Sequence, residues 1–338
     1  MGTINLAIIG CGAITQAAHL PATKRLDGVN VIGLVDRDTT RARTLAALHG
    51  VKHTTGAIDD LPRLPDAAII ALPHHLHARV STDLLRRGVH VLVEKPMALS
   101  TAECDEMIGA STSAGAVLSV GLVRRFLPEI RLAKKLLESG IIGNVRSFDV
   151  REGRIYDWKT ASDFFLKRSA AGGGVLTDAG VHVLDTLQFL LGELAVTSCA
   201  DDSYGGVEAE AEVKLALSNG GVGFVELSRT RNLRNTTRIE GERAALEIDL
   251  VARRVILHRE NSTMEVEWEP GPFGHDIFAA QLADWVDAIR DRRAPMVNGV
   301  QGRGSIALLE ACRTRRTLLR LPWVEPLRRE SAVGESAS

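Results

Sequence analysis

Three ionisable residues recur along a segment that should otherwise form a buried helix. Asp178, His182 and Asp185 lie in residues 172–192, GGGVLTDAGVHVLDTLQFLLG, at steps of four and three. Side chains at this spacing share one face of a helix. Ionisable groups are costly to bury unless they are paired or face a cleft that uses them. The segment is therefore either a core helix with partnered polar groups or one wall of an active site. A structural role fits Asp185 better.

A glycine-rich turn follows the first apolar run of the chain. Residues 10–15 read GCGAIT and come directly after INLAII. In the dinucleotide fingerprint GxGxxG, two glycines allow a tight turn and a close approach to the pyrophosphate, and the third lets a helix pack closely. Thr15 occupies the third position, so an ordinary strand-to-helix turn is the alternative. The context favours a phosphate-binding loop made by Gly10, Gly12, Ala13 and Ile14.

The second apolar run ends in an acidic residue, Asp36. A carboxylate at this place can accept hydrogen bonds from the adenosine ribose hydroxyls, and it repels a 2′-phosphate. Asp36 therefore favours NAD as the cofactor. Arg37 follows immediately and offers a contact to a 2′-phosphate, so NADP stays open.

A lysine ends the fourth long apolar run, HVLVEKP at 90–96. Ligands of parallel α/β sheets bind outside the carboxyl ends of the strands, so Lys95 should point into the cofactor crevice. Pro96 removes a backbone donor and fixes the turn. A surface lysine at a strand end is the alternative interpretation.

Several histidines lie near the same end of the predicted sheet. His74, His75 and His77 follow the third long run, and no cysteine accompanies them as a zinc ligand. We therefore expect no metal site. His19, on the first helix, is expected to be a packing residue.

Two successive patterns of elements must position these residues. Up to residue 122, apolar runs at 4–10, 29–36, 67–72, 90–96 and 115–122 alternate with helix-like stretches at 39–50, 75–88 and 100–111. The last stretch opens with a capping box, Ser100 and Glu103. The alternation predicts an α/β Rossmann domain, a doubly wound parallel sheet, over residues 1–122.

The pattern changes after residue 122. A helix at 128–140 and the segment of the first paragraph are followed, from about 195 to 268, by strand after strand with alternating polarity. Further helices are expected at 276–291 and 301–318. This predicts an α+β domain over 123–324 with an open-faced, mostly antiparallel sheet, whose C-terminal helices can pack back on the first domain. We expect residues 325–338 to form a disordered tail.

Composition narrows the class of protein. The 338 residues contain 41 Lys and Arg against 42 Asp and Glu, a formal net charge of −1. A binder of nucleic acid or acidic membranes would show a basic excess. The four cysteines lie far apart and indicate reduced thiols, and no apolar run approaches the ~20 residues of a membrane span. With no basic leader at the N-terminus, we predict a soluble cytoplasmic protein that binds neither nucleic acid nor membrane.

Taken together, these motifs resemble the Gfo/Idh/MocA family, which includes glucose–fructose oxidoreductase and inositol dehydrogenase. The resemblance covers about residues 3–320. The stretches that carry it are GCGAITQAAHLPA (10–22), ALPHHLHARVSTDLLRRGVHVLVEKPMALS (71–100), RRFLPEIRLAKKLLESGIIG (124–143) and AGGGVLTDAGVHVLDTLQFLLG (171–192). The EKP triplet joined to GGGxLxDxGxHxxD is the specific part. The resemblance implies a Rossmann domain and an open-faced sheet that often mediates oligomerisation, hence a homodimer or homotetramer.

The resemblance also implies an active site. The lysine of EKP, with the aspartate and histidine four residues apart, maps onto Lys95, Asp178 and His182. The proline after the lysine is commonly cis and shapes the nicotinamide pocket, and a histidine is often found at the position of His77. Further cofactor contacts are expected from Leu72, Pro73, His77, Glu94, Lys95 and Pro96.

Each member of this trio has a plausible role. A histidine titrates near neutral pH, so His182 can take a proton from a hydroxyl as hydride leaves the same carbon. Lys95 can stabilise negative charge on the substrate oxygen, and Asp178 can orient the substrate or tune the histidine. The alternative is that Thr177 or Asp178 only caps the helix, in which case these catalytic roles do not apply.

Substrate contacts should come from the second domain. Arg124 begins the crossing between domains, and the loop 153–174 carries Tyr156 and Trp158. An aromatic surface beside cations suits a sugar ring with an attached phosphate or nucleotide. Arg229, Arg231 and Arg234 form another candidate anion site or a polar sheet edge.

The favoured function is an NAD(P)-dependent oxidoreductase that interconverts a secondary alcohol and a ketone on a sugar, nucleotide-sugar or cyclitol. The alternatives are a hydrolase or lyase that uses transient internal redox on a glycoside, and a 3-ketosugar reductase in a biosynthetic pathway. A non-catalytic NAD-binding regulator is disfavoured, because a sensor has no use for a proton relay.

Overall fold

Six strands of the N-terminal half form one parallel sheet. The computed structural model describes residues 2–157, 163–268, 271, 274 and 276–319. The strand order is β3-β2-β1-β4-β5-β6, the order of a dinucleotide-binding Rossmann sheet. The strands are β1 (Ile4–Ile9), β2 (Val29–Val35), β3 (His53–Thr55), β4 (Ala67–Ile70), β5 (His90–Val93) and β6 (Leu118–Val120). The predicted parallel sheet is confirmed.

The helices of this half begin and end at the signals in the sequence. They are α1 (Leu20–Thr23), preceded by the π-helical turn η1 (Thr15–His19), then α2 (Thr39–His49), α3 (His77–Arg86) and α4 (Thr101–Ala114). The capping box at Ser100 and Glu103 is present, with both reciprocal hydrogen bonds formed. Gly50 ends α2 with a φ of 74°, a left-handed conformation that glycine adopts without strain. Short 3₁₀ turns lie at η2 (Ile58–Asp60) and η3 (His74–Leu76).

One strand of this sheet escaped the sequence patterns. β3 consists of His53, Thr54 and Thr55, which are partly or fully exposed at the sheet edge beside β2. An edge strand of three polar residues has neither an apolar run nor a clear alternation. Its pairing with β2, and not its own side chains, defines it.

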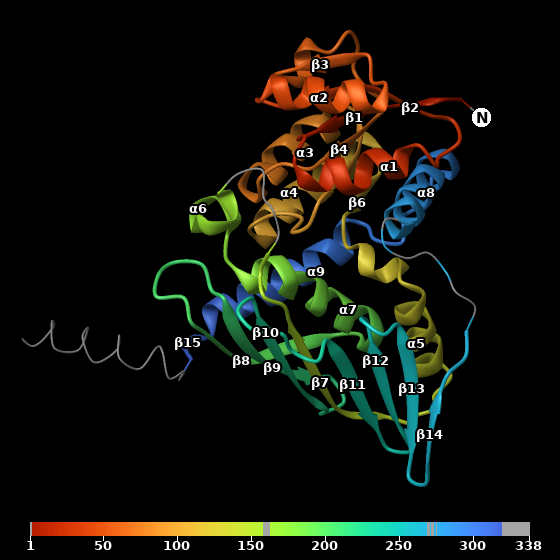
Figure 1. Cartoon of the computed structure of the whole chain (residues 1–338), viewed down its shortest axis with the longest axis vertical. Helices are drawn as coiled ribbons and strands as arrows, with labels where there is room; N and C mark the ends of the chain where they lie inside the picture. Colours follow the sequence, from red (N-terminus) through yellow and green to blue (C-terminus); the bar gives the residue numbers. More distant parts are fainter. Residues whose placement is uncertain (1, 158–162, 269–270, 272–273, 275, 320–338) are drawn as a thin grey trace, which may run out of the picture.

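A second, larger sheet fills the C-terminal half (Figure 1). Its order is β14-β13-β12-β11-β7-β10-β9-β8-β15, antiparallel except for the pairs β7–β10 and β8–β15. The expected mostly antiparallel sheet is confirmed. The strands are β7 (Val145–Gly153), β8 (Leu194–Asp201), β9 (Glu210–Leu217), β10 (Val222–Ser228), β11 (Thr236–Gly241), β12 (Ala245–Asp249), β13 (Arg254–Arg259), β14 (Ser262–Glu265) and β15 (Arg316–Leu318).

Helices cover one face of this sheet, between it and the Rossmann domain (Figure 1). Buried Val225 and Leu227 of β10 alternate with the partly exposed Phe224 and Glu226, so the two faces of the sheet differ in polarity. The elements on the covered side include η4 (Val123–Phe126), α5 (Pro128–Glu138), the π-helical turn η6 (Leu176–Gly180), α7 (Val181–Leu191) and α9 (Gly299–Thr314), with η5 (Phe164–Leu166) and α6 (Arg168–Ala171) before the glycines.

The last two helices return to the first domain. α8 (Asp276–Asp291) packs against α1, and its Leu282, Trp285 and Val286 join a core with Ile8 and Leu34 of the Rossmann sheet. α9 packs between α4 and α7, so it touches both domains. The helix expected to reach residue 318 ends at Thr314, because the next residues pair with β8 as strand β15.

Two further findings concern both domains as far as the structure describes them. In the part of the chain that the structure describes, no helix is both long and apolar enough to cross a membrane. Cys11, Cys104, Cys199 and Cys312 are all buried and unbridged.

Candidate active site

The glycine turn after β1 has the backbone that a bound phosphate needs. Gly10 has a φ of 98°, and a Cβ on it would lie 2.1 Å from the carbonyl oxygen of Ala71, so only glycine fits there. A Cβ on Gly12 would meet nothing within 4 Å, which leaves open space above the loop. The Thr15 hydroxyl donates to the Gly10 carbonyl at 2.6 Å, so threonine ties the helix to the turn where the fingerprint has its third glycine. These residues fit a pyrophosphate at a helix N-terminus.

Asp36 lies beside the glycine turn and also stabilises it through hydrogen bonds. Its carboxylate accepts hydrogen bonds from the backbone N–H of Cys11 at 2.7 Å and of Asp38 at 2.8 Å. A carboxylate has about four acceptor positions, so some remain for ribose hydroxyls. Arg41 lies 3.6 Å from Asp36, whereas Arg37 is exposed. The sequence analysis missed Arg41, a second cation beside the position where a 2′-phosphate would lie.

Glu94 faces the first helix. Its carboxylate lies 2.8 Å from Nε2 of His19 and accepts the backbone N–H of Lys95 at 3.1 Å. His19 is fully buried and packs edge-on against Phe278, so the expected packing residue also orients Glu94. We infer that Glu94 stabilises the cofactor site through its contacts with His19 and with the Lys95 backbone.

His77 braces the turn after Lys95. Its ring nitrogens lie 2.8 Å from the carbonyl oxygens of Pro96 and Leu72, and the side chain is fully buried. Burial lowers the pKa of His77, so the ring is neutral and its single N–H is donated to one of these two carbonyls, while the other ring nitrogen carries no proton. The Lys95–Pro96 peptide bond is cis, as the resemblance implies. This geometry favours a bracing role for His77 over direct contact with the nicotinamide. Pro73 follows Leu72 and directly precedes η3.

The helix with the polar stripe begins against a distant strand. Glu208, just before β9, accepts the backbone N–H of Gly174 at 2.7 Å and of Leu176 at 3.1 Å. A Cβ on Gly174 would lie 1.9 Å from the Glu208 carbonyl oxygen, so the glycine permits this contact. Glu208 thus satisfies the free N–H groups at the start of the helix, and neither Thr177 nor Asp178 caps it. Asp178 lies on the π-helical turn η6, a rare geometry that is frequent at functional sites.

Lys95 and Asp178 meet across the two domains. Nζ of Lys95 lies 2.6 Å from Oδ1 of Asp178 and 3.2 Å from its carbonyl oxygen. Arg229, directly after β10, donates from Nη2 to Oδ2 at 3.0 Å. Burial by itself would raise the pKa of Asp178, but the positive charges of Lys95 and Arg229 outweigh it and hold that pKa well below its usual range. Asp178 is therefore an ionised carboxylate between two cations.

His182 lies four residues further along the same helix. Its Nδ1 is buried and has no hydrogen-bond partner among the described residues. Burial, together with the positive charges of Lys95 and Arg124, lowers its pKa well below the ordinary value of about 6.5, and Asp178 opposes this only in part. The expected titration near neutral pH is therefore wrong. The ring is neutral at physiological pH and can accept a proton.

The arginines at the domain crossing are already paired. Arg124 makes a bidentate contact with Glu152 at 2.7 and 2.6 Å, so its guanidinium is engaged beside His182. Arg125 and Asp185 form a buried ion pair with distances of 2.6 to 3.2 Å. The structural role expected for Asp185 is therefore an ion pair with Arg125, a partner that the sequence did not identify. Arg124 remains a proposed substrate contact through the edge of its side chain, which is 19% exposed.

The remaining substrate candidates are spread over the second domain. Tyr156 is 38% exposed, and its ring lies 5.0 Å from the guanidinium carbon of Arg229. Trp158 lies outside the described residues. Of the three arginines after β10, only Arg229 contacts the trio, whereas Arg231 pairs with Glu210 and Glu226.

Several residues of the site have no local signal in the sequence. Arg229 is 51 residues from Asp178, and Glu208 is 34 residues from Gly174. Arg313 of α9 donates to the carbonyl oxygens of Leu99 at 3.0 Å and Gly172 at 3.2 Å, which joins the loop after Lys95 to the glycine turn. Over the described ranges, no group of three or more His, Cys, Asp or Glu side chains is arranged to hold a metal ion.

Comparison with known proteins identifies the family. The family model described as "Oxidoreductase family, NAD-binding Rossmann fold" matches residues 4–122, and the "GFO/IDH/MocA C-terminal domain" model matches residues 130–247. The chain belongs to the Gfo/Idh/MocA oxidoreductase family, and its first domain is an NAD-binding Rossmann domain.

Among curated proteins, the putative UDP-kanosamine synthase oxidoreductase subunit of Amycolatopsis mediterranei is 33% identical over 196 residues. That match covers 58% of this chain and 54% of the relative, so the chain aligns with about half of that protein. The D-apiose dehydrogenase of Paraburkholderia graminis is 27% identical over 334 residues, which cover 90% of this chain and 85% of the relative.

Solved structures extend the likeness over nearly the whole chain. The aldose-aldose oxidoreductase of Caulobacter crescentus, complexed with glycerol, has a TM-score of 0.82 at 26% identity and covers 91% of this chain and 96% of its own. KijD10, a 3-ketoreductase of Actinomadura kijaniata in complex with NADP and TDP-benzene, has a TM-score of 0.85 at 22% identity, with 95% and 100% covered. The latter likeness shows the two-domain fold.

Proposed function

We propose that the protein interconverts a secondary alcohol and a ketone on a sugar, nucleotide-sugar or cyclitol, with NAD as the favoured cofactor. The observation that carries the proposal is the 2.6 Å contact between Lys95 and Asp178, which joins the end of the Rossmann strand β5 to the helix of the second domain. His182 lies on that same helix. The sugar oxidoreductases among the relatives support the substrate class.

In this proposal Lys95 binds the substrate oxygen and stabilises the negative charge that develops on it. A lysine ammonium has three donors, and two of them are directed at Asp178, one at Oδ1 and one at the carbonyl oxygen. The third can reach the oxygen of the reacting carbon, where a positive charge stabilises negative charge as it develops. Asp178 holds the ammonium in place through these two contacts.

His182 provides the base. Because its pKa is lowered, the ring is neutral at physiological pH and can take the hydroxyl proton in the oxidative direction. When bound, the nicotinamide supplies the hydride chemistry at the same carbon. Asp36 and the glycine turn hold the cofactor at its adenosine and pyrophosphate groups, and Pro96 shapes the pocket at the other end.

The experiment is a panel of candidate substrates, in which the NADH absorbance reports whether the cofactor is reduced. The purified protein is incubated with NAD or NADP and with nucleotide-sugars, free sugars and inositols. Cofactor reduction with one class of substrate supports the proposal and identifies that class. If cofactor binds but is neither reduced by any alcohol nor, as NADH, oxidised by the corresponding ketones, the proposal fails. Cleavage of a glycoside without net NADH would instead support the internal-redox hydrolase.

A further inference from the structure

The turn after β10 is held by an unusual number of side-chain contacts. The Ser228 hydroxyl oxygen accepts the backbone N–H of Thr230 at 3.1 Å and of Arg231 at 2.8 Å, which closes the turn on itself. The backbone N–H of Arg229 donates to the carbonyl of Ala209 at 2.8 Å, so the turn is also fixed to the start of β9.

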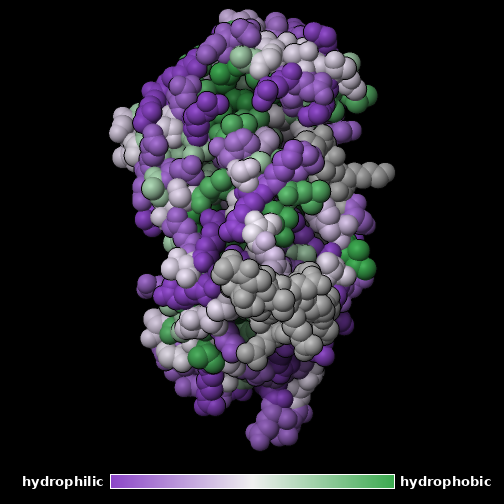
Figure 2. Space-filling view, turned by 90° about the vertical axis from the view of Figure 1, so that its left-hand side faces the viewer, coloured by the Kyte–Doolittle hydropathy of each residue, from purple (hydrophilic) through white to green (hydrophobic). Residues whose placement is uncertain are grey.

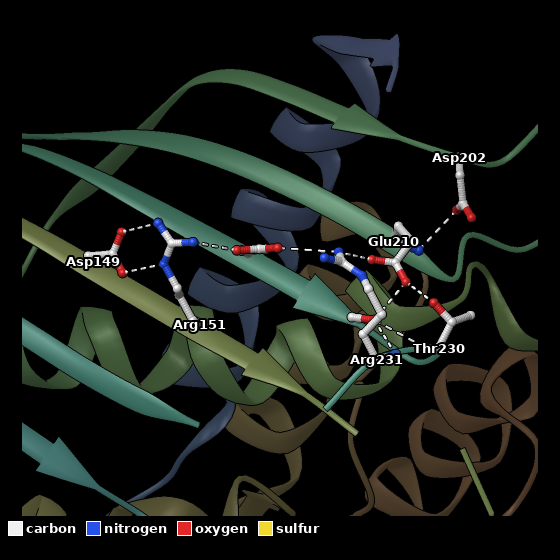
Figure 3. A network of polar contacts seen from close by, with 8 residues as sticks. Asp149, Arg151, Asp202, Glu210, Thr230 and Arg231 are labelled. Atoms are coloured by element: carbon white, nitrogen blue, oxygen red, sulfur yellow. Dashed lines mark hydrogen bonds and ion pairs between the residues drawn. The ribbon is translucent and has the colours of Figure 1, made fainter. Parts of the chain in front are cut away.

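Glu210 is the anchor of this turn. Its side chain is 1% exposed, and its carboxylate accepts the Ser228 hydroxyl at 2.6 Å and also contacts the Thr230 hydroxyl and the Arg231 guanidinium. Figure 3 shows Thr230 and Arg231 both directed at Glu210, within a polar network that extends to Arg151 and Asp149. Because Ser228, Thr230 and Arg231 all contact this one buried carboxylate, the turn has little conformational freedom.

Arg229 has a different set of contacts from its neighbours. While Thr230 and Arg231 turn to Glu210, Arg229 reaches Asp178 Oδ2 at 3.0 Å. Its side chain is 11% exposed, and the Tyr156 ring lies over its guanidinium. Lys95 holds the other oxygen, Oδ1. The two oxygens of Asp178 are thus shared between one cation from each domain.

We propose that Arg229 is a positioning residue of this active site: the turn anchored by Glu210 holds its guanidinium against Asp178 Oδ2, which fixes the carboxylate so that Oδ1 faces Lys95. This inference rests on the function proposed above and adds to it a residue outside the lysine, aspartate and histidine trio.

The charges explain why a second cation is useful there. A carboxylate held by one lysine can rotate and can bind the ammonium through either oxygen. A planar guanidinium on one oxygen removes that freedom and also offsets the burial of the negative charge. Lys95, Arg229 and Asp178 together carry one net positive charge, which suits an oxygen that becomes negative in the reaction.

The first test reads Asp178 directly and needs no substrate. The carbon-13 signal of its carboxyl group, assigned by its loss in Asp178→Asn, is titrated in Lys95→Met and in Lys95→Met/Arg229→Met. With Lys95 gone, Arg229 is the remaining cation on the carboxylate. Removing it should raise the pKa of Asp178 by about 1–3 units, because burial is then no longer offset. Equal titrations in the two variants would overturn the inference even if the proposed function stands.

The second test uses the substrate class found in the panel. Arg229→Met should lower kcat by about 10- to 100-fold while leaving NAD affinity within about two-fold, because Arg229 lies in the second domain. Arg229→Lys should recover much of the rate, and Glu210→Gln should lower it in the same direction as Arg229→Met. Arg259→Met, which removes an exposed cation of the same domain at the end of β13, is the matched control. A normal rate in Arg229→Met would contradict the inference, whereas an inactive wild-type protein would count against the proposed function and leave the carbon-13 result standing.

Discussion

His182 shows how strongly the folded environment changes a single residue. Because burial and two nearby cations lower its pKa, the wild-type rate should show no limb from this group near pH ~6.5 and should fall only at more acidic pH, as the ring gains a proton. His182→Ala should lower the maximal rate about 100-fold without changing NAD affinity. The measurement is kcat/KM against pH for both proteins, because this ratio reports the pKa values of the free enzyme. A wild-type limb near neutrality that disappears in His182→Ala would contradict the lowered pKa.

Asp36 is expected to set the preference between the two cofactors. Asp36→Ala removes the charge that repels a 2′-phosphate and leaves Arg37 and Arg41 nearby, so the ratio of NADP to NAD affinity should rise by about 10-fold, or ~1.4 kcal/mol. Fluorescence titration with NADH and NADPH checks this ratio. Asp60→Asn, which removes an exposed carboxylate of the same domain at the end of η2, is the control and should leave the ratio unchanged. An unchanged ratio in Asp36→Ala would show that another residue reads the ribose.

Single residues were predictable where the chemistry has a local pattern. The strand end singled out Lys95 and the helical spacing singled out Asp178 and His182, whereas only the family resemblance implied that the three form one site. The structure brings Lys95 and Asp178 into contact. Arg229 was only one of three equivalent arginines, because its selection depends on a turn anchored by Glu210. The lowered pKa of His182 has no local signal, because it depends first on burial and then on charges from three different elements.

At the scale of elements, the site depends on how the helix with Asp178 begins. Gly174→Ala would place a Cβ 1.9 Å from the Glu208 carbonyl oxygen, which must push the helix start away from β9. We expect the free energy of unfolding to fall by about 1–3 kcal/mol, measured by urea denaturation. Gly206→Ala is the control, since its Cβ would meet nothing within 4 Å. Equal stability of the two variants would show that the turn adapts.

Elements were predictable in proportion to their length and periodicity. α4 was found with its capping box because the signal lies within four residues. β3 and β15 were missed, since each has three residues and exists only through its neighbour in a sheet. The order of the nine strands in the second sheet likewise depends on long-range pairing, which no local pattern encodes.

At the scale of the molecule, the uncovered face of the second sheet is the expected site of self-association. It carries a groove of about 450 Å³ lined in part by Val222, Phe224 and Lys214, and Val222 is 60% exposed. On the side shown in Figure 2, hydrophilic residues cover most of the coloured surface, with apolar residues in separate patches between them. We predict a homodimer or homotetramer through the groove face, as the family resemblance implies.

A charge introduced into the groove tests whether this face is the interface between subunits. Val222→Glu should shift the solution mass towards the monomer, measured by light scattering after gel filtration, because a buried unpaired carboxylate opposes association. Its thermal stability as a monomer should change little, since the side chain is exposed. A wild-type mass equal to one chain, or an unchanged oligomer in the variant, would contradict this surface as the interface.

The assignment of Lys95 to the substrate oxygen, with little contribution to NAD affinity, is central to the proposed site. Its most direct test compares wild type and Lys95→Met in two assays, NAD affinity by titration and turnover with the substrate class that the panel identifies. We predict NAD affinity within a few-fold and turnover lower by about 100- to 10,000-fold. Comparable turnover in the variant would contradict the assignment of Lys95, and with it the proposed site between the two domains.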